Sequence, residues 1–393
     1  MRFVGTVSRG IRLPIMKKGD DLVKTVVDSV CRAAECDRDP FTMRDRDIVA
    51  ITESLVARSQ GNYVSLKDIS NDVASKFPEG DVAIICPILS RNRFYQLLRG
   101  MVAGIKGNVH IILTYPSDEV GNQIVDPKHF YLNADKLSGE CFGADEFYKV
   151  FGVCKHKFTG VDYIELYQSI DPSRVFVHLS NNPLSALKFA DQVLVASIHA
   201  RFVHREILEH GGAKKVVTMD EICATPPREG AGFNETYGLL GSNYTTDEAV
   251  KLFPRDCKNI VEKIAAEFKA RTGKNIEVMV YGDGAFKDPV CGIWELADPV
   301  VSPGYTDGLD GVPKEIKLKY IADNAEGKDP TEAVKDAIKA KSKIGQFEHS
   351  TMGTTPRRIP DLVGSLSDLT SGSGDKGTPV VYIQGYFDNY LDD

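Results

Sequence analysis

Residues 276–292 read IEVMVYGDGAFKDPVCG, and the sequence changes after Tyr281 from an apolar run to a glycine-rich stretch that contains an aspartate. The apolar run Ile276–Tyr281 predicts a buried strand. It leads directly into Gly282-Asp283-Gly284, a carboxylate between two residues that permit unusual backbone dihedrals. Chains commonly position ligand-binding groups where a strand ends. Asp283 is therefore either a plain turn residue or a ligand for a metal or phosphate.

The segments on either side of this stretch have clear periodicity. Pro254–Thr272 predicts an amphipathic helix, and Gly273 is a natural stop. Pro360–Leu369 predicts another helix, and Pro379–Gln384 predicts a strand near the end of the chain. The stretch Lys314–Ala322 alternates between apolar and polar residues, which predicts a strand with one solvent-exposed face. Helices and strands mix without strict β-α-β alternation. The predicted fold class is therefore α+β, with mixed sheets and flanking helices.

Composition restricts the class of protein. The chain has 393 residues, 42% of them hydrophobic and 26% charged, so it can bury an ordinary core. A net charge of -7 argues against a general nucleic-acid or membrane binder. The eight cysteines form no CxxC pair, which argues against structural zinc. No apolar run approaches the roughly 18 residues of a membrane span. We expect a cytoplasmic protein with reduced cysteines and small-molecule partners.

The glycine-rich stretch Gly372–Gly377 matches GxGxxG. A dinucleotide-binding fingerprint requires a strand before it and a helix after it, whereas the predicted order here is the reverse. The stretch is therefore either a flexible connector or a backbone nest for an anion. No P-loop and no Ser-His-Asp or Cys-His set stands out, so no catalytic residue is predicted.

Arginines and acids gather in the middle of the chain. Arg91, Arg93 and Arg99 flank a predicted helix start, where they either hold a phosphate or carboxylate or form a solvated face. A later turn, Tyr115–Asn122, carries Asp118 and Glu119. We treat Arg91, Arg93, Asp118 and Glu119 as candidate substrate residues.

Three separated stretches, taken in order, resemble one family. The first is GIRLPIMKKGDDL at residues 10–22, with the strand and turn 47–61. The second is GLLGSN at residues 238–243, followed by a helix, a strand and GDGAFKDPVCG. The third is the predicted helix from Asp361, the glycine-rich stretch and PVVYIQG at residues 379–385. Together they resemble the GTP-dependent γ-glutamyl ligases that add glutamate to the deazaflavin coenzyme F-420.

The resemblance implies a two-part α+β fold, often a homodimer, that binds GTP and divalent metal ions, Mg²⁺ or Mn²⁺. In the family the γ-phosphate activates a substrate carboxyl as an acyl phosphate, which the amine of glutamate then attacks. The implied site residues are nucleotide-binding Leu13, Pro14, Ile15, Arg58, Gly372 and Gly374, metal-binding Asp283 and Asp375, and substrate-binding Ser242 and Asn243. The other substrate candidates, Arg91, Arg93, Asp118 and Glu119, match no family motif and lie in the long spacer between the motifs.

The chain departs from the family pattern in several ways: Arg58 stands where lysine is usual, and the arginines that follow the strand aspartate are replaced, leaving Lys287. A metal-binding aspartate of the family falls on Leu240, so either Glu235 or Asp247 supplies the carboxylate or the metal site is altered. The spacer between Gly61 and Gly238 is also unusually long. We therefore expect a ligase-like core at residues 1–80 plus 235–393, with a substrate-facing α/β insertion at 81–234.

Two other functions stay open. The first is a non-catalytic protein of the same fold that binds a nucleotide or anionic metabolite. The second is a phosphotransferase that stops at the acyl phosphate. The sequence decides neither which acceptor substrate is used nor whether the nucleotide is GTP or ATP.

Overall fold

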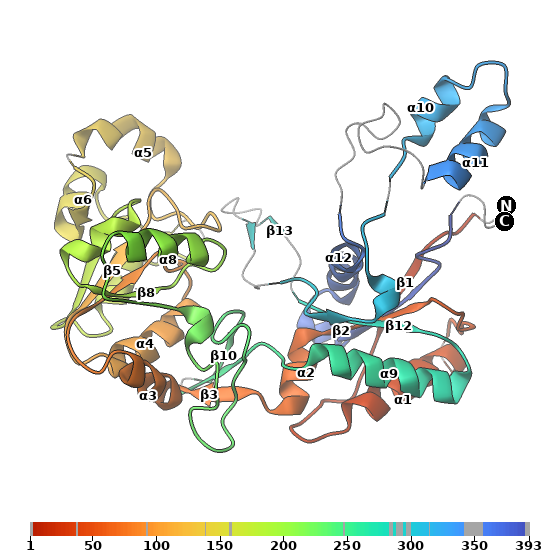
Figure 1. Ribbon diagram of the computed structural model, residues 1–393, viewed down its shortest axis with the longest axis horizontal. Coiled ribbons are helices and arrows are strands. Elements are labelled where there is room, and N and C mark those ends of the chain that lie inside the picture. Colours follow the sequence, from red (N-terminus) through yellow and green to blue (C-terminus); the bar gives the residue numbers. More distant parts are fainter. Residues whose placement is uncertain are drawn as a thin grey trace. The chain divides into compact units, whose positions relative to one another are not determined.

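The computed structural model describes residues 3–36, 38–91, 93–137, 139–156, 159–246, 248–282, 286–287, 294–295, 300–313, 315–341 and 357–389. Figure 1 shows the chain as two compact units. The first unit comprises Met1–Ser59, Asp256–Gly284 and Val300–Asp393, and the second comprises Gln60–Arg255 and Ala285–Pro299. Compactness does not by itself identify an insertion, so the expected insertion at 81–234 stays a prediction. Among the described residues no helix is long and apolar enough to cross a membrane.

The first unit is built on a mixed sheet with strand order β1-β16-β2-β12-β15. The neighbours β2 and β12 run parallel, and the other pairings are antiparallel. All four residues Ile48–Ile51 of β2 are fully buried, as expected for a central strand covered on both faces. The strands are β1 (Val7–Ile11), β2 (Ile48–Thr52), β12 (Glu277–Tyr281), β15 (Gly304–Tyr305) and β16 (Val380–Gln384).

Helices cover both faces of this sheet (Figure 1). Alternate strand residues such as Val49 and Val278 pack against α1 and α9, while Ala50 and Met279 face α12. This period-2 division is what buried strands require. The helices of the unit are α1 (Leu22–Cys36), α2 (Glu53–Gln60), α9 (Cys257–Thr272), α10 (Leu318–Asp323), α11 (Pro330–Ala340), α12 (Ile359–Ser371) and the 3-10 turns η4 (Asp307–Leu309) and η6 (Gly374–Lys376).

The predicted strand at Lys314–Ala322 is wrong. Lys314 lies outside the described residues, and Leu318–Asp323 forms the short helix α10, which packs against α11. No residue of α10 is buried. A strand needs a neighbouring strand to pair its backbone groups, whereas a helix satisfies them internally; alternation over a few residues cannot distinguish these cases.

The second unit holds a sheet with strand order β6-β7-β5-β4-β8-β9. All but β6 run parallel, and in chain order these parallel strands are arranged 3-2-1-4-5, a doubly wound arrangement. The strands of this sheet are β4 (Val82–Ile85), β5 (Val109–Leu113), β6 (Phe142–Gly143), β7 (Val175–Leu179), β8 (Gln192–Val195) and β9 (Lys215–Thr218).

Helices lie on both faces of that sheet too. One core cluster joins it to α3, α4 and α7, and the other joins it to η2 and α8. The helices are α3 (Leu66–Lys76), α4 (Phe94–Gly104), α5 (Pro127–Asn133), α6 (Ala144–Phe151), α7 (Tyr163–Gln168), α8 (Arg201–His210), with η1 (Ala134–Lys136), η2 (Pro183–Lys188) and η3 (Met219–Glu221). A small sheet pairs β3 (Tyr63–Ser65), β11 (Ala249–Lys251) and β10 (Asn243–Thr246), and β13 (Phe286–Lys287) pairs with β14 (Trp294–Glu295). Mixed sheets with flanking helices confirm the α+β prediction for the whole chain.

Candidate functional site

The first unit contains a cavity of about 550 Å³ at one edge of its sheet. The parallel strands β2 and β12 both end there, so Thr52 and Tyr281 contribute to the same wall. The antiparallel strand β16 begins at this edge, which brings the preceding glycine-rich loop to it. The lining residues are Leu13, Pro14, Ile15, Met16, Thr52, Ser54, Leu55, Arg58, Tyr281, Gly282, Asp368, Ser371, Gly372, Ser373, Gly374, Gly377, Thr378 and Pro379.

This wall brings together six residues that the resemblance assigns to a nucleotide. They come from three segments far apart in the chain, and they are Leu13, Pro14, Ile15, Arg58, Gly372 and Gly374. The first segment supplies an apolar surface, since Leu13, Ile15 and Met16 line the cavity and Ile15 is 81% exposed. The glycine loop supplies backbone and hydroxyl groups. The cavity thus offers an apolar side and a polar side, as a nucleotide requires.

Arg58 connects two parts of the wall. Helix α2 begins at Glu53, directly after β2, and carries Arg58 about one turn later. Its Nε donates a hydrogen bond to the Met16 carbonyl at 2.7 Å, which holds the Leu13–Met16 segment against the helix. Within the described part of the chain, Arg58 forms no ion pair with a carboxylate. Its guanidinium can therefore bind an anion in the cavity.

The glycine loop takes its shape from two residues with positive φ. Gly372 (φ 61°) ends α12 and donates its N–H to the Asp368 carbonyl, and Gly377 (φ 66°) leads into β16. Between them, the Ser373 hydroxyl donates to the Asp375 carboxylate. This hydrogen bond is the main reason why the pKa of Asp375 lies below its usual value.

The predicted metal ligands are only partly placed. Asp283 lies outside the described residues, although its neighbour Gly282 lines the cavity. Asp375 lies on the loop but not in the wall, whereas Asp368, in the last turn of α12, does line it. Asp368 was not among the residues predicted from the sequence; its position one turn before the glycine loop was the available signal. Within the described residues no group of three or more His, Cys, Asp or Glu side chains could hold a metal ion.

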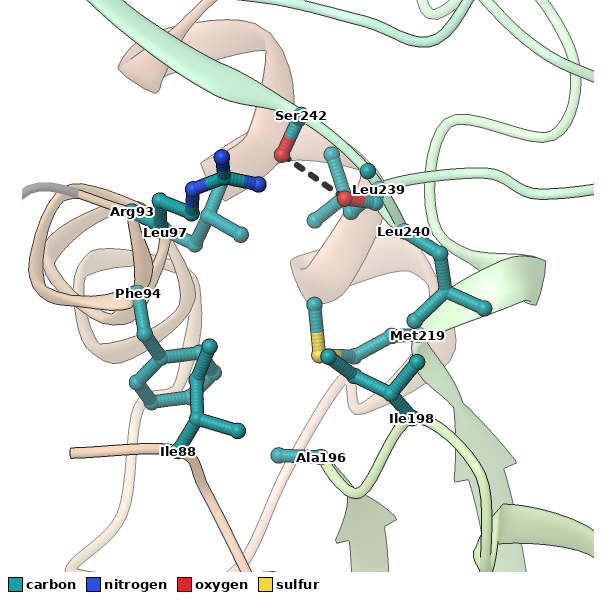
Figure 2. Close-up of a pocket in the computed structure, with 11 residues that line it drawn as sticks. Ile88, Arg93, Phe94, Leu97, Ala196, Ile198, Met219, Leu239, Leu240 and Ser242 are labelled. Carbon is teal, nitrogen blue, oxygen red and sulfur yellow. Dashed lines mark hydrogen bonds between the residues drawn. The ribbon is translucent and has the colours of Figure 1, made fainter. Parts of the chain in front are cut away.

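The second unit has a different cavity, shown in Figure 2. Arg93, at the start of α4, and Ser242 lie at its polar end, so the structure brings together two predicted substrate residues that are far apart in sequence. Ser242 donates to the Leu239 carbonyl at 2.7 Å. The remaining lining is mostly apolar, and the volume is about 20 Å³, enough for about one water molecule. The lining residues are Ile88, Arg93, Phe94, Leu97, Ala196, Ile198, Met219, Leu239, Leu240, Gly241 and Ser242.

Leu240, the residue at the family's aspartate position, is 1% exposed and lies in this apolar cavity (Figure 2). An unpaired carboxylate or a metal ion would be strongly destabilised there. Of the alternatives, Glu235 is an exposed residue and Asp247 lies outside the described residues. The surroundings of Leu240 do not fit a metal site.

Asp118 holds its own loop together. The carboxylate is 7% exposed and accepts hydrogen bonds from the N–H groups of Leu89, Val120 and Asn122 and from the Asn122 side chain, at 2.7–3.0 Å. Burial raises the pKa of Asp118 to about 6, and the hydrogen bonds oppose this shift.

Glu119 accepts from the backbone N–H groups of Ile198, His199 and Ala200, just before α8. An acid at the positive end of a helix is stabilising. Both predicted substrate acids therefore bind backbone amides in this structure. Of the other two substrate residues, Arg91 is exposed just before α4, and Asn243 begins β10 opposite Lys251.

A pair of histidines lies on the same sheet, on β5 and β7. His110 Nδ1 and His178 Nε2 are 3.1 Å apart, and both rings stack against Phe189. Burial, with a smaller contribution from His110, lowers the pKa of His178 to about 4. Burial also lowers the pKa of His110, so both rings favour the neutral form.

Comparison with known proteins identifies the family. A model of the F420-0:gamma-glutamyl ligase family matches residues 10–385, nearly the whole chain. The search of curated proteins finds no match to the sequence. The match confirms the resemblance seen in the three ordered motifs, and it supports a ligase-like function. The chain belongs to the F420-0:gamma-glutamyl ligase family.

Proposed function

We propose that the protein is a nucleotide- and metal-dependent γ-glutamyl ligase that joins glutamate to a carboxylate acceptor through an acyl phosphate. The observation that carries the proposal is the cavity in the first unit, where six predicted nucleotide residues from three distant segments form one wall. Its volume, about 550 Å³, lies within the range of small-molecule sites. GTP is the proposed nucleotide.

In the proposed reaction an oxygen of the acceptor carboxylate attacks the γ-phosphorus of GTP. The bond to the bridging oxygen breaks, and GDP leaves. The amine of glutamate then attacks the acyl carbon, inorganic phosphate leaves with the bonding electron pair, and the nitrogen loses a proton. Phosphoryl transfer of this kind depends mainly on positioning and charge stabilisation.

The residues of the wall supply positioning. Arg58 can hold phosphate oxygens while its Nε keeps the Leu13–Met16 segment in place. The hydroxyls of Ser371, Ser373 and Thr378 add hydrogen-bond donors. Asp368, Asp375 and the sequence-predicted Asp283 are the carboxylates that would hold Mg²⁺ or Mn²⁺, which would neutralise charge on the phosphoryl oxygens.

The test is nucleotide turnover. GTP should be consumed in the presence of Mn²⁺ or Mg²⁺ when glutamate and an acceptor carboxylate are supplied, and Asp283→Ala should lose turnover while keeping its circular dichroism spectrum. If calorimetry with either metal detects no nucleotide binding, the proposal is wrong. Nucleotide consumption without glutamate, trapped by hydroxylamine, would instead indicate a phosphotransferase that stops at the acyl phosphate.

One observation favours the second candidate, a non-catalytic nucleotide or anionic-metabolite binder. Leu240 occupies an apolar cavity where the resemblance calls for a metal-binding aspartate. A binder of this kind should gain thermal stability from GTP by mass action without turnover. The proposed homodimer and cytoplasmic location stay predictions. Light scattering of the purified protein tests the dimer.

A further inference from the structure

The wall of the cavity in the first unit is short of positive charge. Arg58 and Asp368 are the charged side chains among its described lining residues, and their formal charges cancel. A nucleoside triphosphate carries several negative charges, and proteins hold them with Lys, Arg and metal ions. Among the described lining residues Arg58 is the cationic side chain that can offset these charges, so a second cationic side chain at the rim would add to the proposed metal ions.

Lys376 lies where such a cation is needed. Its side chain folds back across Gly372, a lining residue: a Cβ added to Gly372 would stand 2.6 Å from Lys376 Nζ and 3.0 Å from its Cε. Gly372 also has φ +61°, a conformation that L side chains rarely adopt. Glycine at position 372 therefore has two roles: it adopts the positive φ that ends α12, and its lack of a Cβ leaves space for the lysine side chain.

The ammonium group is available to a ligand. Lys376 is exposed, and although its backbone N–H donates to the Ser373 carbonyl, its ammonium group makes no hydrogen bond or ion pair within the described part of the chain. The carboxylate of its own loop, Asp375, is bound by Ser373, and the charge of Lys376 adds a smaller attraction to it. The position therefore presents a cation beside the wall without an internal partner that would have to be displaced.

A structural role is the competing explanation. A cation near the last turn of α12 interacts favourably with the negative end of the helix dipole, an effect of about 0.3–1 kcal/mol at an exposed site. That role affects the stability of the unliganded protein. Phosphate binding affects nucleotide affinity, so the two explanations can be separated by measurement.

We infer that Lys376 binds the terminal phosphates of the nucleotide and, with Arg58, makes the site selective for a triphosphate over a monophosphate. This inference rests on the proposed function, since it assumes that the cavity binds a nucleotide. It assigns the loop Gly372–Gly377 a role through its lysine, in addition to the backbone and the carboxylate of Asp375.

The experiment is calorimetric titration of the full chain with GTP and with GMP, in the presence of Mg²⁺. Lys376→Ala should lose about tenfold to 100-fold in affinity for GTP, the value of one charge-assisted hydrogen bond. Its affinity for GMP should change by less than about twofold, and Lys376→Arg should keep most of the GTP affinity. The matched control is Lys263→Ala, which removes an exposed lysine of α9 outside the lining.

A double-mutant cycle tests the geometry. Gly372→Ala places a methyl group in the space of the ammonium, so it should weaken GTP binding. Part of this loss comes from the positive φ of Gly372 and persists without the lysine, so the loss in the double variant should be smaller than the sum of the two single losses. A fully additive loss contradicts the placement of the lysine.

Three other results overturn the inference. If Lys376→Ala binds GTP as tightly as the unaltered protein does, the inference is refuted but the proposed function is not. A lower melting temperature without loss of GTP affinity assigns Lys376 to the helix end. No GTP binding by the unaltered protein refutes the proposed function, and the inference with it.

Discussion

The two units each carry a cavity at an edge of a sheet, and the cavities have opposite character. In the first unit the wall combines hydroxyls, glycine backbone and Arg58 around about 550 Å³. In the second unit Leu239, Leu240 and Phe94 are among the residues around a cavity of about 20 Å³ (Figure 2). The first can admit a nucleotide, and the second is almost closed. A doubly wound sheet commonly binds ligands outside the carboxyl ends of its strands, but the cavity of the second unit, which holds such a sheet, is almost closed.

The difference shows how similar positions take different roles. In the second unit, polar groups near the strand ends are used internally: Asp118 and Glu119 bind backbone amides of neighbouring loops. In the first unit, Arg58 donates one hydrogen bond to the Met16 carbonyl and also lines the cavity.

The largest effect should come from Leu240→Asp, which restores the residue type of the family. A carboxylate in this apolar cavity would have no partner, so the free energy of unfolding should fall by about 4 kcal/mol. Urea denaturation followed by circular dichroism measures this. Leu240→Met, which conserves volume, should cost less than about 1.5 kcal/mol. A stable Leu240→Asp protein that binds Mn²⁺ more tightly would contradict the contrast between the cavities.

Asp118→Ala should be the next most harmful change. It leaves the buried N–H group of Leu89 and the partly buried N–H groups of Val120 and Asn122 without their acceptor, and we expect a loss of about 3 kcal/mol in urea denaturation. Asp118→Asn keeps one acceptor oxygen and should lose less. If Asp118→Ala unfolds like the unaltered protein but binds an acceptor carboxylate differently, Asp118 is a substrate residue after all.

Arg58→Ala should weaken GTP binding by about tenfold to 100-fold, because it removes a charged donor from the wall. Calorimetry gives the affinity. Arg58→Lys keeps the charge but loses the Nε bond to the Met16 carbonyl, so its loss should be intermediate. Equal affinities of Arg58→Lys and Arg58→Ala would show that the geometry of the guanidinium matters more than its charge.

The smallest effect concerns pH. The pKa of His178 is about 4 in the folded protein, below its value of 6.5 in model compounds, so its contribution to stability is present above pH 6.5 and lost as the pH falls towards 4. After allowance for solvent screening, we expect a loss of about 1 kcal/mol between pH 7 and 5.

Asp118 acts in the opposite direction. Its folded pKa is raised to about 6, so its contribution is greatest below pH 3.8 and is lost as the pH rises through 6. The informative measurement is therefore the difference between the unaltered protein and His178→Phe, which keeps a ring against Phe189 but cannot titrate. If both lose the same stability on acidification, His178 does not sense pH.

Periodicity predicted the regular elements where their environment follows from their own residues. The helix predicted at Pro254–Thr272 is α9, and the strand at Ile276–Tyr281 is β12, because each has one continuous buried pattern. The strand predicted at Lys314–Ala322 was wrong because the alternating pattern was short and no residue of α10 is buried. The packing of α10 on α11 decided the secondary structure there. For the site, the order of three motifs identified the segments that form one wall, but not Asp368 or Lys376.

The sequence by itself determined the family, the α+β class and the segments that line the candidate nucleotide site, because these depend on local pattern and motif order. The tertiary structure decided which polar groups are already used. Asp118 meets Leu89, Glu119 meets Ile198, and Arg58 meets Met16 across 29, 79 and 42 positions of sequence. Such pairings follow from how packed elements bring distant backbone groups within hydrogen-bond distance, and no local pattern encodes them.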